Sequence, residues 1–393
     1  MLEAKRVVGV DPGTKSFDIV CVEGPRVVYE KSINTAELAE KPELLIDALN
    51  EAGAEYVVAP SGYGVPVTRG DEVLDAEKFT VEILLLSSEE DIRRGIELGE
   101  VGAQVYVAMA KLAKRIVSSY GSRAFFIPSI VLLPTIPFHR KLNKIDMGTA
   151  DKLAAAFVAV HAFARDEGVD YGDVNVVVAE LGYGYNAAIA VEGGKIVDAV
   201  GGTAASIGTL TAGSLDLEVV AHAGKWHRWD VFYGGIFHLA KVYDMSALAK
   251  AYENSEEPLA SLFLAYIEGV AKDIARARAV FKPPRKVETV ILTGRHSKVP
   301  LVVKLLREHL PDMEVRPSGV LEGASMSKEA GQGYAAIGEG IAGGYFSRLV
   351  KHMGIDRACG TVADYVVHPR AEEFKKRLVE RYRELVKNPR LCT

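Results

Sequence analysis

The chain has 393 residues, of which 49% are hydrophobic and 25% are charged, as is typical of a globular protein with a large core. A chain of this length is expected to form two domains rather than one. The formal net charge is −5, from 47 Lys and Arg against 52 Asp and Glu, which excludes the basic surface of a dedicated nucleic-acid-binding protein.

No segment is expected to cross a membrane, because the longest apolar stretch, residues 124–138, is short and contains three prolines. Asp11 precedes any apolar run of the kind found in secretory signals, so the cytoplasm is the expected location. The cysteines, Cys21, Cys359 and Cys392, lie far apart in the sequence and lack the paired spacing of metal sites. We therefore expect neither a structural metal nor a disulfide framework.

The chain begins with the pattern of a three-stranded antiparallel meander. A short apolar strand at 6–10 is followed by the turn Asp11-Pro12-Gly13-Thr14-Lys15-Ser16, a strand at 17–23, the turn Gly24-Pro25 and a strand at 26–33.

The same order recurs from residue 175, with the turn Glu180-Leu181-Gly182-Tyr183-Gly184-Tyr185 between its first two strands. A constant offset of 169 residues places Val7 on Val176, Gly13 on Gly182, Val22-Glu23-Gly24 on Val191-Glu192-Gly193, and Asp11 on Glu180. Identical residues at unbroken spacing predict two halves of similar structure.

Alternating α and β patterns follow each meander. The first half has expected helices at 35–52, 89–119 and 149–166 and strands at 56–59 and 124–127. The second half has expected helices at 258–280, 299–310 and 327–345, a strand at 289–292, and a charged terminal helix at 370–387.

Two common nucleotide-binding motifs are disfavoured. The sequence contains no Gly-x-x-x-x-Gly-Lys-Ser/Thr, which excludes a P-loop. Gly182-x-Gly184-x-x-Ala187 matches a dinucleotide fingerprint, but the next residues continue as a strand rather than as the helix that receives a pyrophosphate.

A carboxylate followed by a glycine turn between antiparallel strands suits a different phosphate site. Glycine at 13 and 182 allows close approach of a phosphate to backbone N–H groups, and Thr14, Lys15 and Ser16 add donors and charge. Asp11 and Glu180 are candidate ligands of hydrated Mg²⁺. Plain hairpin turns are the alternative, and the duplicated pair favours phosphate binding.

These motifs resemble those of the superfamily that contains actin, sugar kinases, acetate kinase and the ATPase domain of heat-shock seventy proteins. The two turns resemble its phosphate loops. Its adenosine motif is similar to Val290-Ile291-Leu292-Thr293-Gly294-Arg295, and its last small-residue helix is similar to residues 330–340. The stretch 140–152 and the overall layout are also similar to an uncharacterised archaeal family labelled predicted butyrate kinase.

The resemblance implies an α/β fold of two similar actin-like (ribonuclease H-like) domains, 1–165 and 166–393, with ATP and Mg²⁺ bound in a cleft between them. The residues then expected around the nucleotide are Gly13, Thr14, Lys15, Ser16, Gly182, Tyr183, Gly184, Gly202, Thr203, Thr293, Gly294 and Arg295. Glu180 replaces the aspartate usual in this superfamily, and the serine-rich run typical of acetate and butyrate kinases is missing from the first turn.

The acceptor side is predicted in the segment 139–152, which is rich in ionisable residues beside an apolar helix. Arg140 and Lys144 are candidates to bind an anionic substrate or the transferring phosphoryl group. Asp151 is a candidate base or metal-orienting group, and Asp146 is an alternative base. A basic surface loop, with Asp151 capping the helix, is the competing interpretation.

The expected function is transfer of the γ-phosphoryl group of ATP to a short-chain carboxylate, with Asp11, Arg140, Lys144 and Asp151 as catalytic residues. A sugar or polyol kinase, or a non-catalytic ATP-dependent assembly module, stays open. The expected partner is a small-molecule substrate, with neither nucleic acid nor membrane, and a homodimer stays open. The aromatic and histidine-rich segment 222–230 receives no role.

Overall fold

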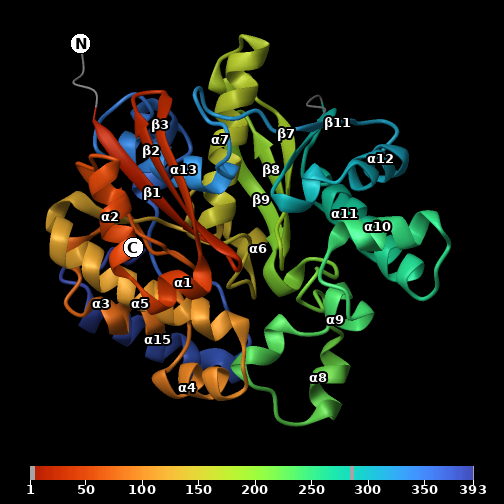
Figure 1. Cartoon of the computed structure of the whole chain (residues 1–393), viewed down its shortest axis with the longest axis horizontal. Coiled ribbons are helices and arrows are strands. Elements are labelled where there is room, and N and C mark those ends of the chain that lie inside the picture. Colours follow the sequence, from red (N-terminus) through yellow and green to blue (C-terminus); the bar gives the residue numbers. More distant parts are fainter. Residues whose placement is uncertain (1–4, 284–286, 393) are drawn as a thin grey trace. The chain divides into compact units, whose positions relative to one another are not determined.

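The computed structural model describes residues 5–283 and 287–392. The chain forms two compact units: unit 1 holds the described residues up to Tyr171 and from Gly319 onward, and unit 2 holds those of Gly172–Ser318. This division differs from the expected domains, 1–165 and 166–393, because the C-terminal segment returns to the first unit, as its blue ribbon shows (Figure 1). The expected α/β class of two similar domains is confirmed.

Unit 1 is built on a six-stranded mixed sheet. Strands β1 and β2 and strands β2 and β3 pair antiparallel, whereas β4 and β6 continue the sheet parallel to β1. In spatial order the strands are β3 (Arg26–Asn34), β2 (Ser16–Glu23), β1 (Arg6–Pro12), β4 (Tyr56–Val58), β6 (Ala124–Phe126) and β5 (Thr68–Arg69).

Unit 2 repeats this arrangement with five strands. An antiparallel meander lies on one side of β7, and parallel strands lie on the other. The spatial order is β11 (Glu314–Pro317), β10 (Thr289–Thr293), β7 (Val176–Leu181), β8 (Asn186–Glu192) and β9 (Lys195–Gly201). Because β8 is a strand, the dinucleotide interpretation of the Gly182 turn is wrong.

The duplication extends to the register of the strands. Val7 faces Val22 and Asp11 faces Asp18 in unit 1, and an offset of 169 gives the observed pairs Val176 with Val191 and Glu180 with Ala187 in unit 2. The pairing with the third strand shifts between residues 21 and 22 in one unit and between 190 and 191 in the other. Two hairpins of unrelated origin have no reason to share both register and bulge, so the prediction of two similar halves is confirmed.

In unit 1, helices α7 and α13 pack against each other and α13 also packs on β1, β2 and β4 (Figure 1). Helix α5 packs against α1, α3 and α4. The α-helices are α1 (Thr35–Glu40), α2 (Glu43–Glu51), α3 (Ala76–Lys78), α4 (Glu89–Glu97), α5 (Val101–Tyr120), α6 (Phe138–Lys141), α7 (Ala150–Glu167), α13 (Glu329–Ile341), α14 (Ser347–His352) and α15 (Glu372–Leu385).

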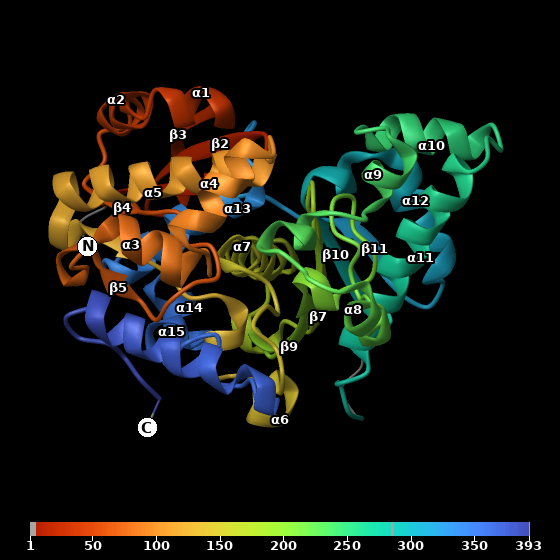
Figure 2. The ribbon, with the colours of Figure 1, turned by 90° about the horizontal axis from the view of Figure 1, so that it is seen from below.

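In unit 2, α11 packs on β7, β8 and β9, with α10 and α12 against it (Figure 2). The α-helices are α8 (Leu217–Ala223), α9 (Ile236–Ala240), α10 (Met245–Glu253), α11 (Leu259–Arg278) and α12 (Pro300–His309). Within the described ranges, none of the helices combines the length and the apolar character needed to cross a membrane.

Two expected helices are each broken in two. The helix expected at 35–52 is interrupted before Pro42, which lacks the N–H that a continuous helix needs. The helix expected at 89–119 is interrupted near Gly99, whose φ of +74° ends α4 in the left-handed region.

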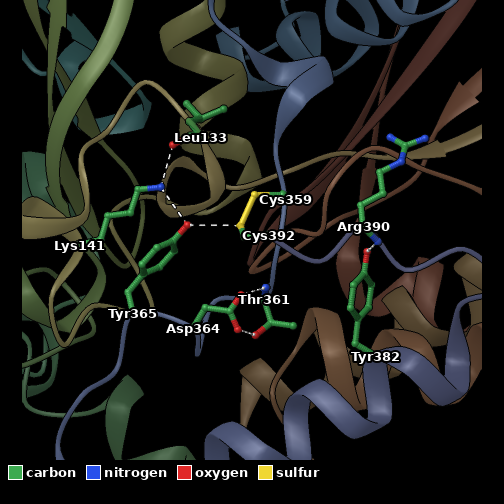
Figure 3. Close-up of a disulfide and its surroundings, with 9 residues drawn as sticks. All are labelled: Leu133, Lys141, Cys359, Thr361, Asp364, Tyr365, Tyr382, Arg390 and Cys392. Carbon is green, nitrogen blue, oxygen red and sulfur yellow. Dashed lines mark hydrogen bonds between the residues drawn. A yellow bond between two sulfur atoms is a disulfide. The ribbon is translucent and has the colours of Figure 1, made fainter.

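The expectation that the chain has no disulfide is wrong. Cys359 and Cys392 are bonded, with their Cα atoms 5.0 Å apart (Figure 3). The tail after α15 returns to the loop at Gly360, whose N–H donates to the Arg390 carbonyl at 2.7 Å. Sequence spacing alone does not reveal this return, which depends on how α15 packs. Cys21 is buried and unpaired with another cysteine.

Candidate functional site

The first candidate phosphate turn lies at the end of β1 in unit 1. The Gly13 N–H donates to the Ser16 carbonyl at 3.1 Å, and the Gly13 carbonyl accepts from the Thr35 hydroxyl at 2.8 Å. A Cβ at Gly13 would lie 2.4 Å from the Ser16 carbonyl oxygen, so this turn requires glycine. Thr14 and Ser16 are half-buried, and Lys15 is exposed.

Two carboxylates and a lysine gather beside this turn. Asp11 is only 3% exposed, and its Oδ2 accepts from the Lys328 ammonium at 2.7 Å. Lys328 Nζ also lies 3.7 Å from Asp18 Oδ2, and the Lys328 backbone N–H donates to the same oxygen at 3.1 Å. The Ser32 hydroxyl donates to the other Asp18 oxygen at 2.9 Å.

The charges in this cluster influence one another. Burial raises the pKa of Asp11, and Asp18 and Asp151 raise it further, whereas Lys328 opposes the shift. Burial would lower the pKa of Lys328, but Asp11 and Asp18 outweigh burial and raise it. The lysine is therefore firmly cationic, in a cluster where carboxylates outnumber it.

Asp151, in the first turn of α7, completes this group. Its Oδ1 accepts from the Thr149 hydroxyl, and its Oδ2 lies 2.8 Å from Lys152 Nζ. Burial opposes its ionisation, but Lys152 and Thr149 outweigh burial and lower the pKa of Asp151. The structure thus brings Asp151 within electrostatic reach of Asp11 and Lys328, although they lie far apart in the sequence.

The other charged residues of the predicted acceptor segment have different surroundings. Arg140, at the end of α6, and Lys144 are half-buried, and their roles stay predictions. Asp146 accepts from the Gly148 N–H at 2.7 Å, which makes it part of the bend before α7.

Lys141 of the same segment has a structural role (Figure 3). Its ammonium donates to the Leu133 carbonyl at 2.8 Å and to the Tyr365 hydroxyl at 3.1 Å, and burial lowers its pKa to about 8. The Tyr365 hydroxyl lies 4.0 Å from Cys392 Sγ, so the lysine connects this segment to the disulfide-bonded tail.

The second candidate phosphate turn lies at the end of β7 in unit 2. The Gly182 N–H donates to the Tyr185 carbonyl at 3.2 Å, as Gly13 does to Ser16 at the corresponding positions. The Gly184 carbonyl accepts from the Leu210 N–H at 3.2 Å, and the Tyr183 carbonyl accepts from the Thr209 hydroxyl. These hydrogen bonds hold the turn against the loop that contains residues 209 and 210.

The expected adenosine motif lies next to this turn. Thr293 of β10 pairs in register with Glu180 of β7. Gly294 has a φ of +84°, and a Cβ there would lie 2.6 Å from Glu180 Oε1. The Arg295 guanidinium lies 5.9 Å from the centre of the Tyr183 ring. The structure therefore groups Glu180, the second turn and the 293–295 segment within unit 2.

Gly202 and Thr203 follow β9 in a short turn, with Gly202 at a φ of +60° and Thr203 exposed. Buried Asp273 of α11 fixes the loop that follows, because its Oδ2 accepts from the Ser206 N–H at 2.7 Å. In the segment 222–230, Trp229 is buried and Trp226 is exposed.

Among the described residues, no group of three or more His, Cys, Asp or Glu is arranged to hold a metal ion. Mg²⁺ that arrives with a nucleotide needs few protein ligands, because phosphates and waters fill most of its positions. A buried carboxylate beside a glycine turn, as at Asp11, fits that requirement, so the donor set suits a nucleotide-bound ion.

Sequence reasoning missed two residues of the unit 1 cluster. Asp18 is a carboxylate within an otherwise apolar strand, which is a recognisable signal. Lys328 directly precedes the small-residue helix, but nothing in its neighbours points to the first turn near the other end of the sequence.

Comparisons with known proteins agree with this architecture. A family model described as "Protein of unknown function (DUF1464)" matches residues 9–368. A curated relative, probable butyrate kinase 2 of Caldanaerobacter subterraneus subsp. tengcongensis, is 23% identical over 321 residues, which cover 74% of this chain and 85% of the relative.

Two solved structures share the fold. Acetate kinase from Entamoeba histolytica is similar over 78% of this chain and 86% of its own, with a TM-score of 0.51 and 14% identity. A propionate kinase from Francisella tularensis is similar over 84% of this chain and 98% of its own, with a TM-score of 0.55 and 13% identity. At these identities the likeness shows the actin-like fold and not the substrate.

Proposed function

The chain belongs to the family described as protein of unknown function DUF1464, and from its own residues we propose that it is an ATP- and Mg²⁺-dependent phosphotransferase acting on a short-chain carboxylate. The observation that carries this proposal is the group formed at the first glycine turn by buried Asp11 with half-buried Lys328 and Asp151. The name of the curated relative, a probable butyrate kinase, supports the choice of acceptor.

In this mechanism the glycine turn of unit 1 contacts the phosphates of ATP. Backbone N–H groups around Gly13 bind phosphate oxygens, and Asp11 would orient the hydrated metal. In unit 2, the Gly182 and Gly294 turns are the candidates for nucleotide contacts. Bound Mg²⁺ would neutralise charge on the phosphates. Arg140 and Lys144 hold the acceptor carboxylate.

The transfer step needs positioning and positive charge more than proton chemistry. An oxygen of the acceptor carboxylate bonds to the γ-phosphorus, and the bond from that phosphorus to the β–γ bridging oxygen breaks, so its electron pair leaves with ADP. No proton moves, because a carboxylate is already ionised near neutral pH. The lowered pKa of Asp151 suits this reaction, since a weakly basic carboxylate is a poor base for a hydroxyl acceptor.

A hydroxylamine trap tests the acceptor class. The full chain is incubated with ATP, Mg²⁺ and hydroxylamine together with acetate, propionate, butyrate or a branched acid, and hydroxamate is measured. We expect hydroxamate with at least one acid, because acyl phosphates react with hydroxylamine whereas sugar phosphates do not. Asp11→Asn tests the role of this carboxylate in the same assay. It should lower the rate of hydroxamate formation by about a hundredfold, which corresponds to about 2.7 kcal/mol of activation barrier.

Other outcomes identify the alternatives. ATP consumption that depends on a sugar or polyol, without hydroxamate from any acid, would reject the carboxylate and make Asp151 the leading base candidate. ATP-dependent assembly without turnover of any acceptor would reject the phosphotransferase itself.

A further inference from the structure

Lys328 belongs to the unit 1 cluster, and the proposed reaction assigns it no task. Its side chain is 25% exposed, and its ammonium lies 2.7 Å from Asp11 Oδ2. A Cβ built on Gly13 would lie 2.8 Å from Lys328 Nζ, so the ammonium lies directly against the first glycine turn. A cation in this position can reach a phosphate bound at the turn.

The backbone before Lys328 is held in place by Glu30. Its carboxylate accepts from the N–H groups of Ser325, Met326 and Ser327 at 2.9, 3.2 and 3.1 Å, and from the hydroxyls of both serines. Burial opposes ionisation of Glu30, but these serine hydrogen bonds outweigh it and lower its pKa. Asp18 then accepts the Lys328 N–H. Lys328 is therefore placed by the loop rather than drawn to Asp11 alone.

The charges near Lys328 favour the entry of another cation. The carboxylates of Asp11, Asp18 and Asp151 act on one another and on Lys328, while Lys152 pairs with Asp151. Three negative charges against two positive charges give an excess of one negative charge. A further cation can enter this group at lower cost than it could enter a balanced ion pair.

The contact to Asp11 conflicts with the metal-orienting role of that carboxylate. Lys328 Nζ forms an ion pair with Asp11 Oδ2. This is one of only two oxygens with which Asp11 can orient a hydrated metal ion. Two cations cannot share one lone-pair direction without strong repulsion. A metal held at this oxygen would displace the lysine from Asp11, and a phosphate bound at Gly13 would lie within its reach.

We propose that Lys328 is a catalytic residue that holds the place of the metal at Asp11 in the free protein and moves to the γ-phosphoryl group when Mg²⁺-ATP binds. This inference rests on the proposed function and deepens it. The lysine reduces the negative charge of the acidic group before binding, and in the complex it stabilises negative charge on the group being transferred.

Lys328→Met tests the proposal with two binding measurements that need no acceptor. The ratio of ATP to ADP affinity, measured by calorimetry with Mg²⁺, should fall about tenfold, because ADP lacks the phosphate that the lysine contacts. The affinity for Mn²⁺ alone, measured by electron paramagnetic resonance, should rise severalfold because the competing ammonium is gone. Lys328→Arg should retain most of the affinity ratio.

Lys31→Met is the matched control, because it removes a lysine of the same sheet that pairs with Glu51 at the surface. It should change neither measurement. A folded Lys328→Met protein with wild-type values of both would overturn the proposal and leave Lys328 a structural ion-pair partner. If Lys328→Met does not fold, Lys328→Gln takes its place. If the wild type binds no ATP, the proposed function fails, and the Mn²⁺ titration alone then decides whether Lys328 occupies the metal position.

Discussion

Single residues show which ionisable groups of unit 1 serve folding rather than chemistry. His161 of α7 is 5% exposed, its Nδ1 lies 2.8 Å from the Tyr171 hydroxyl, and its ring lies 5.0 Å from that of Phe346. Burial lowers the pKa of His161 to about 4. It is therefore a neutral core residue and has no part in the proposed transfer.

This burial gives the protein a predictable sensitivity to acid. Between pH 6.5 and pH 4 the unfolded chain is protonated at His161 while the folded chain is not, so the free energy of unfolding falls as the pH falls. The loss at pH 4 should reach about 2–3 kcal/mol relative to pH 7. Urea unfolding at pH 7, 5.5 and 4 measures it.

His161→Gln should remove this part of the pH dependence, since glutamine does not titrate. His222→Gln is the control, because the His222 side chain is 84% exposed, and it should follow the wild-type profile. The assignment is contradicted if His161→Gln loses as much stability between pH 7 and pH 4 as the wild type does.

Gly294 gives a second prediction, which concerns the single carbon atom that an alanine would add. A Cβ there would lie 2.6 Å from both Glu180 Oε1 and the Leu181 carbonyl oxygen, at a φ of +84°. Gly294→Ala should therefore displace the second turn and weaken ATP binding at least tenfold. Gly343→Ala has a similar φ of +89° but open space around the Cβ, so it isolates the backbone cost alone.

Calorimetry and thermal melts separate the two effects. Gly343→Ala should cost about 1 kcal/mol of stability and leave ATP affinity unchanged, whereas Gly294→Ala should cost more and lose affinity. Equal stability and equal ATP affinity in the two variants would remove Gly294 from the nucleotide site.

At the scale of elements, α13 shows why small residues gather in one helix. A Cβ at Gly333 would lie 2.0 Å from the Ala154 carbonyl oxygen of α7, and one at Gly338 would lie 2.2 Å from a methyl group of Val58. The glycines bring the helix against α7 and the sheet. The resemblance placed this helix correctly, but the sequence did not reveal that it packs on the N-terminal unit.

Gly333→Ala should destabilise the protein by about 2–4 kcal/mol, because the backbone carbonyl that it meets cannot turn aside. Gly331→Ala is the matched control in the same helix, since its nearest neighbour is a Val20 methyl group at 2.9 Å, which can shift by a rotamer change. Denaturant unfolding compares the two. Equal losses would show that close packing against α7 does not determine the choice of glycine at 333.

The sequence predicted features that depend on neighbouring residues better than contacts between segments far apart in the chain. Both meanders were predictable because turn residues and strand alternation are local, and the offset of 169 even carries the bulge from residues 21–22 to 190–191. The Asp11 and Lys328 pair was not predictable, because it joins β1 to the start of a helix that returns from the far end of the chain. The Glu180 and Gly294 contact lies between these cases, since parallel pairing of β7 and β10 aligns them.

At the scale of the whole molecule, the C-terminal segment connects the end of the chain to its beginning. Arg381 of α15 donates to Glu82 at 2.7 Å, and Lys387 N–H donates to the Glu72 carbonyl at 2.8 Å. The disulfide joins Cys359 to Cys392, which are 33 residues apart in the sequence, and so closes this segment into a loop. The order of the segments in sequence thus differs from their grouping in space.

Reduction of this disulfide should lower the stability of the protein by about 3–4 kcal/mol, because the open chain regains the entropy of a loop of this length on unfolding. Thermal melts with and without a dithiol reductant measure the change. The double variant Cys359→Ser with Cys392→Ser should melt near the reduced wild type and should not respond to the reductant. Cys21 does not confuse the comparison, because burial raises its pKa to about 12 and keeps the thiol unreactive. A wild type whose melting is unaffected by the reductant, although thiol titration shows the bond to be open, would mean that the contacts of α15 alone hold the tail.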